Sequence, residues 1–544
     1  MAFLRNLMLA AASVFFIQNI DCQNVSEASA LSGSLQANGN FYIRDTAIGA
    51  ANSPQYDHQL VGADAWLTLN YQRGGFDIGV RFDVFQNSQL PNPKESYSAS
   101  GIGRFYLKKR VGDLTIYGGY IYDQIGAGVI FRSYEDRPLG IDNALVGLHL
   151  DYQISDNWHV KAFSGRQKQQ FSTYKSTLNG INTEGFISLK NGALTLAPGI
   201  GIVHRTLDDD ATNQLVSALA TYAKADSIGA KYNTFAATFY NTLSAGKWTW
   251  YVEAALKSAD AIFDPNAERL NRDGSLSLGK FVSRSGSVIY SNIGFATEGF
   301  GATLEVKRTD GFTFRTTPFA QLNRGTVNFL PPMSRQNSYR LTTRYVPATQ
   351  ELGEQAAQLD VKIAPTEKLN FDANFSTIYD LNNRLLYREI YASVLLKNAA
   401  DEWTFGIQHQ VYNQQVYEVK PNVANVQTVT PFAEWRRRFS ETKSLKIEAQ
   451  YMATQQDYGS WLYGSAELSI APSWVFSIAD MWNVAPKKTA DALHYPSVSV
   501  AFSRGNNRLS LAFVKQVEGI VCTGGICRLE PAFSGFRLAV ASNF

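Results

Sequence analysis

Apolar and polar residues alternate with a period of two through much of this 544-residue chain. Successive side chains of a β-strand point to opposite faces, so the alternation predicts strands with one apolar and one polar face. Residues 76–84, 368–379 and 444–454 show the pattern most clearly. In residues 368–379 one face carries Leu369, Phe371, Ala373, Phe375 and Thr377, and the other carries Asn370, Asp372, Asn374 and Ser376.

The charged residues on these strands indicate which face meets lipid. In residues 101–110, Arg104 and Lys108 share the polar face. Placing a basic residue in hydrocarbon near the bilayer midplane costs about 2 to 4 kcal/mol, so the polar faces are expected to point inward. The pattern therefore predicts an all-β fold, a transmembrane antiparallel up-and-down β-barrel.

The predicted connections alternate between short turns and longer loops, which is typical of outer-membrane barrels. The short turns are residues 73–75, 111–113, 155–157, 191–192, 244–246, 298–299, 365–367, 399–401, 440–443, 471–473 and 505–506. The longer loops are residues 45–58, 87–100, 126–143, 170–180, 207–228, 264–285, 309–354, 419–426 and 486–493. Two members of the second class, near Asn382 and Tyr458, are short.

This reading gives about 24 strands, within a range of about 22 to 26, since a strand and its connection take about 22 residues each. The first strand runs up from Gly33 and the last runs down to Phe544, so both ends are expected in the periplasm. Residues 338–345 would make 26 strands if they form part of an additional hairpin. Residues 23–544 are expected to form a single barrel domain.

The N-terminus has the features of a signal peptide. Arg5 precedes an apolar run over residues 7–17, and a plausible cleavage site surrounds Cys22, which predicts a signal peptide at residues 1–22. The apolar run is shorter than the roughly 20 residues of a transmembrane helix. Lipidation of Cys22 is the alternative to its removal, but Asp21 is not the small residue expected before a lipidated cysteine.

Aromatic residues suggest an orientation for the barrel. Trp158, Trp248, Trp403 and Trp474 each lie close to the end of a short turn, where a periplasmic aromatic girdle is expected. Aromatic packing in a soluble sheet is the alternative. The terminal Phe544 ends an alternating strand and resembles the signal that the outer-membrane assembly machinery reads.

Two stretches carry a family resemblance. Residues 126–144, with the sequence Gly-Ala-Gly-Val-Ile-Phe-Arg-Ser-Tyr-Glu-Asp-Arg-Pro-Leu-Gly-Ile-Asp-Asn-Ala, and residues 521–544 resemble a group of uncharacterised outer-membrane barrels from Bacteroidota. The resemblance runs through most of the mature chain. It implies a bacterial outer-membrane location and no established activity.

The sequence lacks recognisable catalytic or cofactor motifs, so an enzyme, a cofactor and a metal centre are not expected. The six histidines are scattered without metal-ligand spacing, and the balance of 50 Lys+Arg against 47 Asp+Glu argues against nucleic-acid binding. The acidic run 208–210 could hold calcium, but a solvated loop is the simpler interpretation. Hydrolysis at the barrel rim would need an acidic or nucleophilic constellation that the sequence does not display.

The charged loop 126–143 contains the candidate constriction. Five of its residues are charged and close in sequence: Arg132, Glu135, Asp136, Arg137 and Asp142. A loop folded inward would narrow the lumen with opposed charges, as selective pores do. A surface loop with internal ion pairs is the alternative. Arg436 and Arg438 are expected to face the lumen near the periplasmic mouth.

The last two cysteines, Cys522 and Cys527, lie near one turn. An exported protein meets an oxidising compartment, so these two cysteines are predicted to form a disulfide.

Two functions are compatible with such a barrel. The first is a channel or porin-like solute conduit whose lumen is partly filled by the 46-residue loop 309–354. Five large apolar residues of this loop and Pro331-Pro332 would be costly to leave in water, namely Phe312, Phe314, Phe319, Phe329 and Leu330. The second is a non-conducting scaffold whose outer loops dock surface lipoproteins or a secretion or assembly machine. Outer-membrane lipid and the β-barrel assembly machinery are the expected partners.

Overall fold

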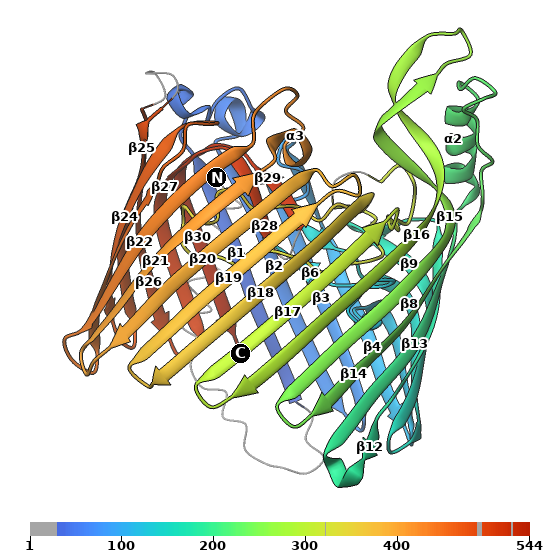
Figure 1. The fold of residues 1–544 in the computed structure, drawn as a ribbon, viewed down its shortest axis with the longest axis horizontal. Coiled ribbons are helices and arrows are strands. Elements are labelled where there is room, and N and C mark those ends of the chain that lie inside the picture. The colour runs from blue at the N-terminus through green and yellow to red at the C-terminus, as the bar shows by residue number, and fades with distance from the viewer. Residues whose placement is uncertain (1–29, 321–322, 487–491, 524–525) are drawn as a thin grey trace.

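The computed structural model describes residues 30–320, 323–486, 492–523 and 526–544. They form a closed antiparallel β-barrel with a projection at one end (Figure 1). The sheet contains 26 strands, two of which are the short segments β10 (Ser172–Thr173) and β12 (Ile187–Leu189), so 24 strands make the wall. The predicted number of 24 is confirmed. The predicted signal peptide, residues 1–22, lies outside the described residues.

The first twelve wall strands are β1 (Ala30–Tyr42), β2 (Val61–Arg73), β3 (Phe76–Ser88), β4 (Tyr97–Val111), β5 (Leu114–Ile121), β8 (Leu145–Ser155), β9 (Trp158–Gln169), β11 (Thr177–Gly185), β13 (Leu194–Thr206), β14 (Asn233–Ala245), β15 (Trp248–Leu270) and β16 (Leu276–Thr297). The other twelve are β17 (Phe300–Asp310), β18 (Gly353–Thr366), β19 (Leu369–Tyr379), β20 (Leu385–Lys397), β21 (Asp401–Tyr412), β22 (Val426–Arg438), β23 (Lys443–Met452), β24 (Ser460–Ile470), β25 (Trp474–Ala485), β26 (His494–Arg504), β27 (Asn507–Gln516) and β30 (Phe533–Asn543).

Each wall strand pairs with its neighbours in the chain, and the pairing of β1 with β30 closes the cylinder. Phe544 extends this seam, since its backbone exchanges two hydrogen bonds with Gly33. The short connections gather at one end of the barrel, the turn end, and the long connections gather at the other, the loop end (Figure 1).

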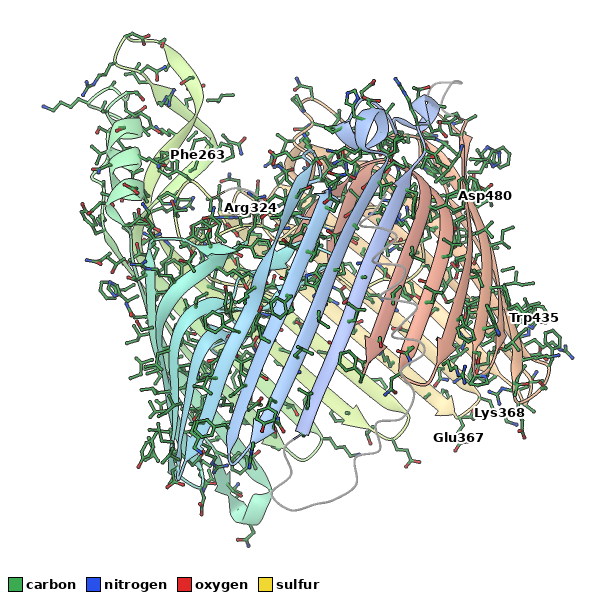
Figure 2. All side chains as sticks on the ribbon, turned by 180° about the vertical axis from the view of Figure 1, so that it is seen from behind. Phe263, Arg324, Glu367, Lys368, Trp435 and Asp480 are labelled. Carbon is green, nitrogen blue, oxygen red and sulfur yellow. The ribbon has the colours of Figure 1, made fainter. Side chains whose placement is uncertain are left out.

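The two faces of the wall follow the alternation. In β19, Phe371 and Phe375 are exposed on the outside, whereas Asn374 and Ser376 are buried inside. Trp248, Trp403 and Trp474 stand exposed on the outer face close to the turn end. Figure 2 shows Trp435 at the same end, where its ring stacks on that of Trp403 at 5.5 Å between centroids.

The loop end carries the remaining elements. They are two short hairpins, β6 (Glu135–Asp136) with β7 (Ile141–Asp142) and β28 (Gly519–Thr523) with β29 (Ile526–Glu530), and two helices, α2 (Asp209–Leu219) and α3 (Gln414–Tyr417). A 3₁₀-helix at Thr46–Ile48 and a π-helix at Gln55–Gln59 also lie in a loop-end connection, and a 3₁₀-helix at Lys190–Gly192 lies in a turn. No helix among the described residues has both the length and the apolar character needed to span a bilayer.

Two predicted loops differ from the structure. Residues 264–285 were expected to be a loop, but β15 and β16 continue as a hairpin beyond the barrel rim (Figure 1). This hairpin and α2 form the projection, and its extension is stabilised because Ala261 and Phe281 pack against Leu215 and Leu219 of α2. Residues 338–345 form turns rather than an additional strand, because they pack inside the barrel, where no neighbouring edge is free.

Candidate functional site

The loop between β17 and β18, residues 311–352, folds into the bore, and we refer to it as the plug loop. Its first half packs against a dry apolar cluster. Phe312 and Phe314 are fully buried there together with wall residues such as Phe163 and Val203. The expectation that this loop fills part of the lumen agrees with these contacts.

The second half of the plug loop is held mainly by amide side chains of the wall. Gln450 accepts a hydrogen bond from the backbone N–H of Leu341 at 2.7 Å. Gln408 and Gln410 each donate at 3.2 Å to plug carbonyls, those of Thr342 and Tyr345. Apolar packing accompanies these hydrogen bonds, because Leu341 and Tyr345 are buried in a second cluster with wall residues such as Tyr387 and Met452.

Two further plug residues, one charged and one an amide, complete this attachment. Arg335 donates to Asp372 of β19 at 2.8 Å, and its guanidinium lies 3.7 Å from the ring centroid of Tyr391. Asn337 donates to the buried carboxylate of Glu389 at 2.7 Å. The segment from Arg335 to Tyr345 thus lies along the inner wall from β19 to β24.

The charged loop between β5 and β8, residues 122–144, also folds inward, and we refer to it as the hairpin loop. Arg81 on the inner face of β3 anchors it. The Arg81 guanidinium donates to Glu135 at 2.8 Å and to Asp142 at 3.2 Å, while Asp83 accepts from its other edge at 2.6 and 2.8 Å. Lys168 of β9 forms a second ion pair with Asp142. These contacts hold the hairpin loop against the inner faces of β3 and β9, and its role as a constriction stays a prediction.

The other predicted residues of the hairpin loop have different roles. Arg132 lies 4.1 Å from the ring centroid of Phe329 in the plug loop and 4.5 Å from that of Tyr134. Arg137 donates to Gln36 of β1 at 2.5 Å and pairs with Glu135 at 3.1 Å. Asp136 accepts from the backbone of Leu139 inside the loop. These residues fasten the loop to the wall and to the plug loop.

The two inward loops also share backbone hydrogen bonds. The N–H of Arg132 donates to Val327, and the N–H of Phe329 donates to Gly128, both at 2.9 Å. Gly128 has a φ of 94°, a conformation that glycine adopts without steric cost. The two loops therefore form one unit across the bore.

Arg436 and Arg438 lie apart from this unit. They occupy the turn-end part of β22, where Arg436 pairs with Glu402 and Glu434 at 3.6 and 3.5 Å. Their positions share one face of the strand with the buried Phe432, and a role of these arginines at the mouth of the lumen stays a prediction. The structure does not bring them together with the hairpin loop.

Several buried pairs escaped the sequence analysis. Lys307 and Glu354 pair at 2.8 Å at the base of the plug loop, and Arg205 pairs with Asp260 at 2.9 Å beside its first half. The signal available in the sequence was a charged residue on the polar face of a strand, which many lumen positions share. The paths of the inward loops are needed to recognise which of these charged residues form buried pairs.

The acidic run 208–210 has a structural role. Asp208 is the N-cap of α2, and its carboxylate accepts from the N–H of Ala211 at 3.0 Å. Asp209 and Asp210 occupy the first turn, where negative charge is favourable. Asp208 also accepts from the hydroxyl of Ser176 at 2.9 Å. The α2 start could have been recognised from Asp208 as a capping residue.

The predicted disulfide remains a prediction. The register of the β28–β29 hairpin places Cys522 directly opposite Cys527. This hairpin lies over the mouth, because Arg528 donates to the carbonyls of Gln89 and Leu90 at 2.6 and 2.7 Å.

Two cavities lie on opposite sides of the plug loop. The one at the loop end has a volume of about 450 Å³ and lies between plug residues 336–345 and the outer loops. The one toward the turn end has a volume of about 710 Å³ and extends from the plug loop to Lys247 and Ala296 beside the short turns. Gln336 lines both cavities. Gln336 is therefore part of the boundary that the two cavities share.

Comparisons with known proteins concern the fold. No curated protein matches the chain. Among solved structures, the translocation pore of the P pilus usher PapC has a TM-score of 0.44 at 10% identity, covering 95% of this chain and 99% of that chain. The unliganded ferric citrate transporter FecA has a TM-score of 0.40 at 10% identity, covering 96% and 79%. OccK8 (OprE) of Pseudomonas aeruginosa has a TM-score of 0.39 at 9% identity, covering 96% and 99%.

These similarities carry no residue role to the chain. The sequence profile of the "Family of unknown function (DUF6029)" matches residues 3–544, and the chain therefore belongs to this family.

Proposed function

We propose that this protein is a solute conduit of a bacterial outer membrane, restricted by the two inward loops. The observation that carries the proposal is the pair of cavities on either side of the plug segment, with Gln336 in the lining of both. A solute would pass from the loop end to the turn end by way of Gln336. Passage needs no catalysis or cofactor, in keeping with the absence of catalytic motifs in the sequence.

The proposed location rests on the outer wall. Exposed aromatic and aliphatic side chains cover it, and tryptophans gather near the turn end, as in outer-membrane barrels. In this proposal the loop end faces the exterior and the turn end faces the periplasm. We propose Phe544 as the assembly signal, outer-membrane lipid and the assembly machinery as partners, residues 1–22 as the signal peptide, and a Bacteroidota origin.

Conductance in planar bilayers tests the conduit. The full chain should carry ions in discrete steps. Replacing residues 334–345 by a short Gly-Ser linker should raise the conductance several-fold, because it removes the segment that is bound by amide hydrogen bonds and by the buried side chains of Leu341 and Tyr345. The separate cluster around Phe312 and Phe314 stays in place.

The matched control replaces residues 271–275 at the tip of the projection and should leave conductance unchanged. Absence of conductance from both the full chain and the shortened plug loop, in protein that is folded and inserted, would contradict the conduit.

A scaffold is the second candidate, and the projection favours it. Leu276 and Leu278 are 69% and 73% exposed near the tip of the β15–β16 hairpin, beyond the barrel rim (Figure 1). Figure 2 shows Phe263 on the same projection, on the opposite side from Glu367 and Lys368 at the turn end. Stoichiometric co-purification of a surface lipoprotein, abolished by Leu276→Ser with Leu278→Ser, would support the scaffold.

A further inference from the structure

The cavity at the loop end presents two arginines of the plug loop. Arg340 and Arg344 lie four residues apart in a series of turns, and both line the cavity of about 450 Å³. Arg340 is exposed to this space. The volume lies within the range of cavities that hold small molecules, roughly 300 to 1,000 Å³.

Neither arginine forms an ion pair with a carboxylate among the described residues. Arg344 instead lies 4.5 Å from the ring centroid of Trp461 and 5.2 Å from that of Tyr458. Its Nε is buried without a hydrogen-bond partner in the described part of the chain. The two guanidinium groups thus have unused capacity for an anion.

Most carboxylates of the same cavity already have partners. Lys420 pairs with Glu418 at 2.7 Å and with Asp457 at 3.1 Å. The Tyr345 hydroxyl also donates to Asp457, at 2.8 Å. Glu530 pairs with Arg528 at 3.2 Å.

Glu518 is the one lining carboxylate without an ion pair to a described cation. It contributes a negative potential near Tyr458. A bound anion would therefore be attracted by the arginines and repelled by Glu518.

We propose that Arg340 and Arg344 form a binding site for small oxyanions, carboxylates or phosphates, in the loop-end cavity. The inference rests on the proposed conduit, since it names the class of solute that would reach Gln336. Guanidinium groups bind carboxylate and phosphate oxygens through charge-assisted hydrogen bonds. The lining as a whole carries three basic and four acidic side chains, so the attraction for an anion comes from the two arginines and not from the net charge of the cavity.

Single-channel recordings with succinate, inorganic phosphate and glucose test the site. Succinate or phosphate in the loop-end compartment should reduce the current, and neutral glucose should not. Arg340→Gln with Arg344→Gln should raise the half-blocking concentration about tenfold or more, since both charge-assisted hydrogen-bond donors to the anion are lost. The double lysine variant, which keeps both charges, should retain most of the block.

Two further variants separate the site from general charge effects. Glu518→Gln should lower the half-blocking concentration, because it removes the opposing charge. Arg272→Gln, at the exposed tip of the projection, removes one positive charge far from the cavity and should have no effect. The half-blocking concentration is measured separately for succinate and for phosphate, and the anion with the lower value is the preferred oxyanion.

A separate measurement distinguishes failure of the site from failure of the conduit. If the protein conducts but neither oxyanion alters the current, the site is overturned and the conduit stands. If the protein does not conduct, calorimetric titration of the purified full chain with succinate and phosphate tests the site independently. Binding to the native chain that is lost in the double glutamine variant supports the site. Absence of binding to the native chain overturns it.

Discussion

The side chains of Lys307 on β17 and Glu354 on β18 form an ion pair at 2.8 Å at the base of the plug loop, and both are almost completely buried. Lys307 also donates to the carbonyl of Pro331. We expect Lys307→Met to lower the free energy of unfolding by about 3 to 5 kcal/mol, because it leaves Glu354 charged, buried and without its partner.

The double variant Lys307→Met with Glu354→Leu provides the control. Apolar side chains can replace a buried ion pair with little loss of stability, so the double variant should recover most of the loss. Urea unfolding of the barrel in lipid vesicles measures both changes. A double variant as unstable as the single one would contradict this account of the pair.

Arg81 is expected to hold the hairpin loop inside the barrel. Arg81→Ala removes the donor for Glu135 and Asp142 and leaves Asp83 uncompensated, so the loop should detach from the wall. Trypsin should then cleave after Arg132 at least several-fold faster than in the native protein, whereas the bond after Arg137 is resistant because Pro138 follows it. Arg81→Lys keeps the positive charge but loses the planar guanidinium that donates to several carboxylates at once. The rate of tryptic cleavage should therefore lie between those of the native protein and Arg81→Ala. Equal cleavage of all three proteins would rule out the anchoring role.

Two adjacent residues of β17 test the orientation of the wall. Leu304 is exposed on the outer face, and Thr303 lines the turn-end cavity. Leu304→Arg should reduce the stability of the inserted barrel by up to about 2 to 4 kcal/mol, whereas Thr303→Arg should have a small effect because its charge meets water. The fraction of folded protein in vesicles measures the difference. A larger penalty at Thr303 would reverse the assigned faces.

Asp457 is expected to make the attachment of the plug loop sensitive to acid. Burial raises the pKa of Asp457, but Lys420, Arg344 and the hydrogen bond from Tyr345 more than offset this effect, so the pKa lies below its ordinary value. A lowered pKa stabilises the folded state above the ordinary value of about 3.9, and this stabilisation is lost as the pH falls through the lowered pKa.

Hydrogen exchange of residues 339–345 measures this dependence. Exchange, corrected for its intrinsic pH dependence, should accelerate as the pH falls below about 4. In the Asp457→Asn variant, hydrogen exchange of residues 339–345 should be faster already at neutral pH. The rate in this variant should no longer increase as the pH falls below about 4. If the variant shows the same increase of exchange at low pH as the native protein, a titratable group other than Asp457 causes the pH dependence.

Much of the wall could be predicted because its signals are local. The alternation of Phe371 and Phe375 with Asn374 and Ser376 follows from the period of a strand and the contrast between its two environments. The prediction for residues 264–285 was wrong because turn-forming residues suggested a loop, whereas contacts with α2 extend the hairpin. That contact joins segments far apart in the chain, and no local pattern reports it.

The contents of the bore were only partly predictable. The apolar residues of the plug loop indicated that it must pack against something, but not against what. Leu341 meets Gln450 and Thr326 meets Gln167, pairs separated by 109 and 159 residues. Many lumen positions carry amides or charges, so the sequence does not distinguish those that contact a loop from those that face water.

The sequence by itself determined the barrel, its 24 strands and the division of its wall into an apolar and a polar face, since each depends on residues close together in the chain. The tertiary structure alone decided that the hairpin loop bends inward, that Arg81 holds it, and that Gln336 is part of the boundary that two cavities share. The physical reason is that closing the cylinder brings distant strands around one enclosed space, and the position of a loop in that space depends on charges and amides supplied by all of them.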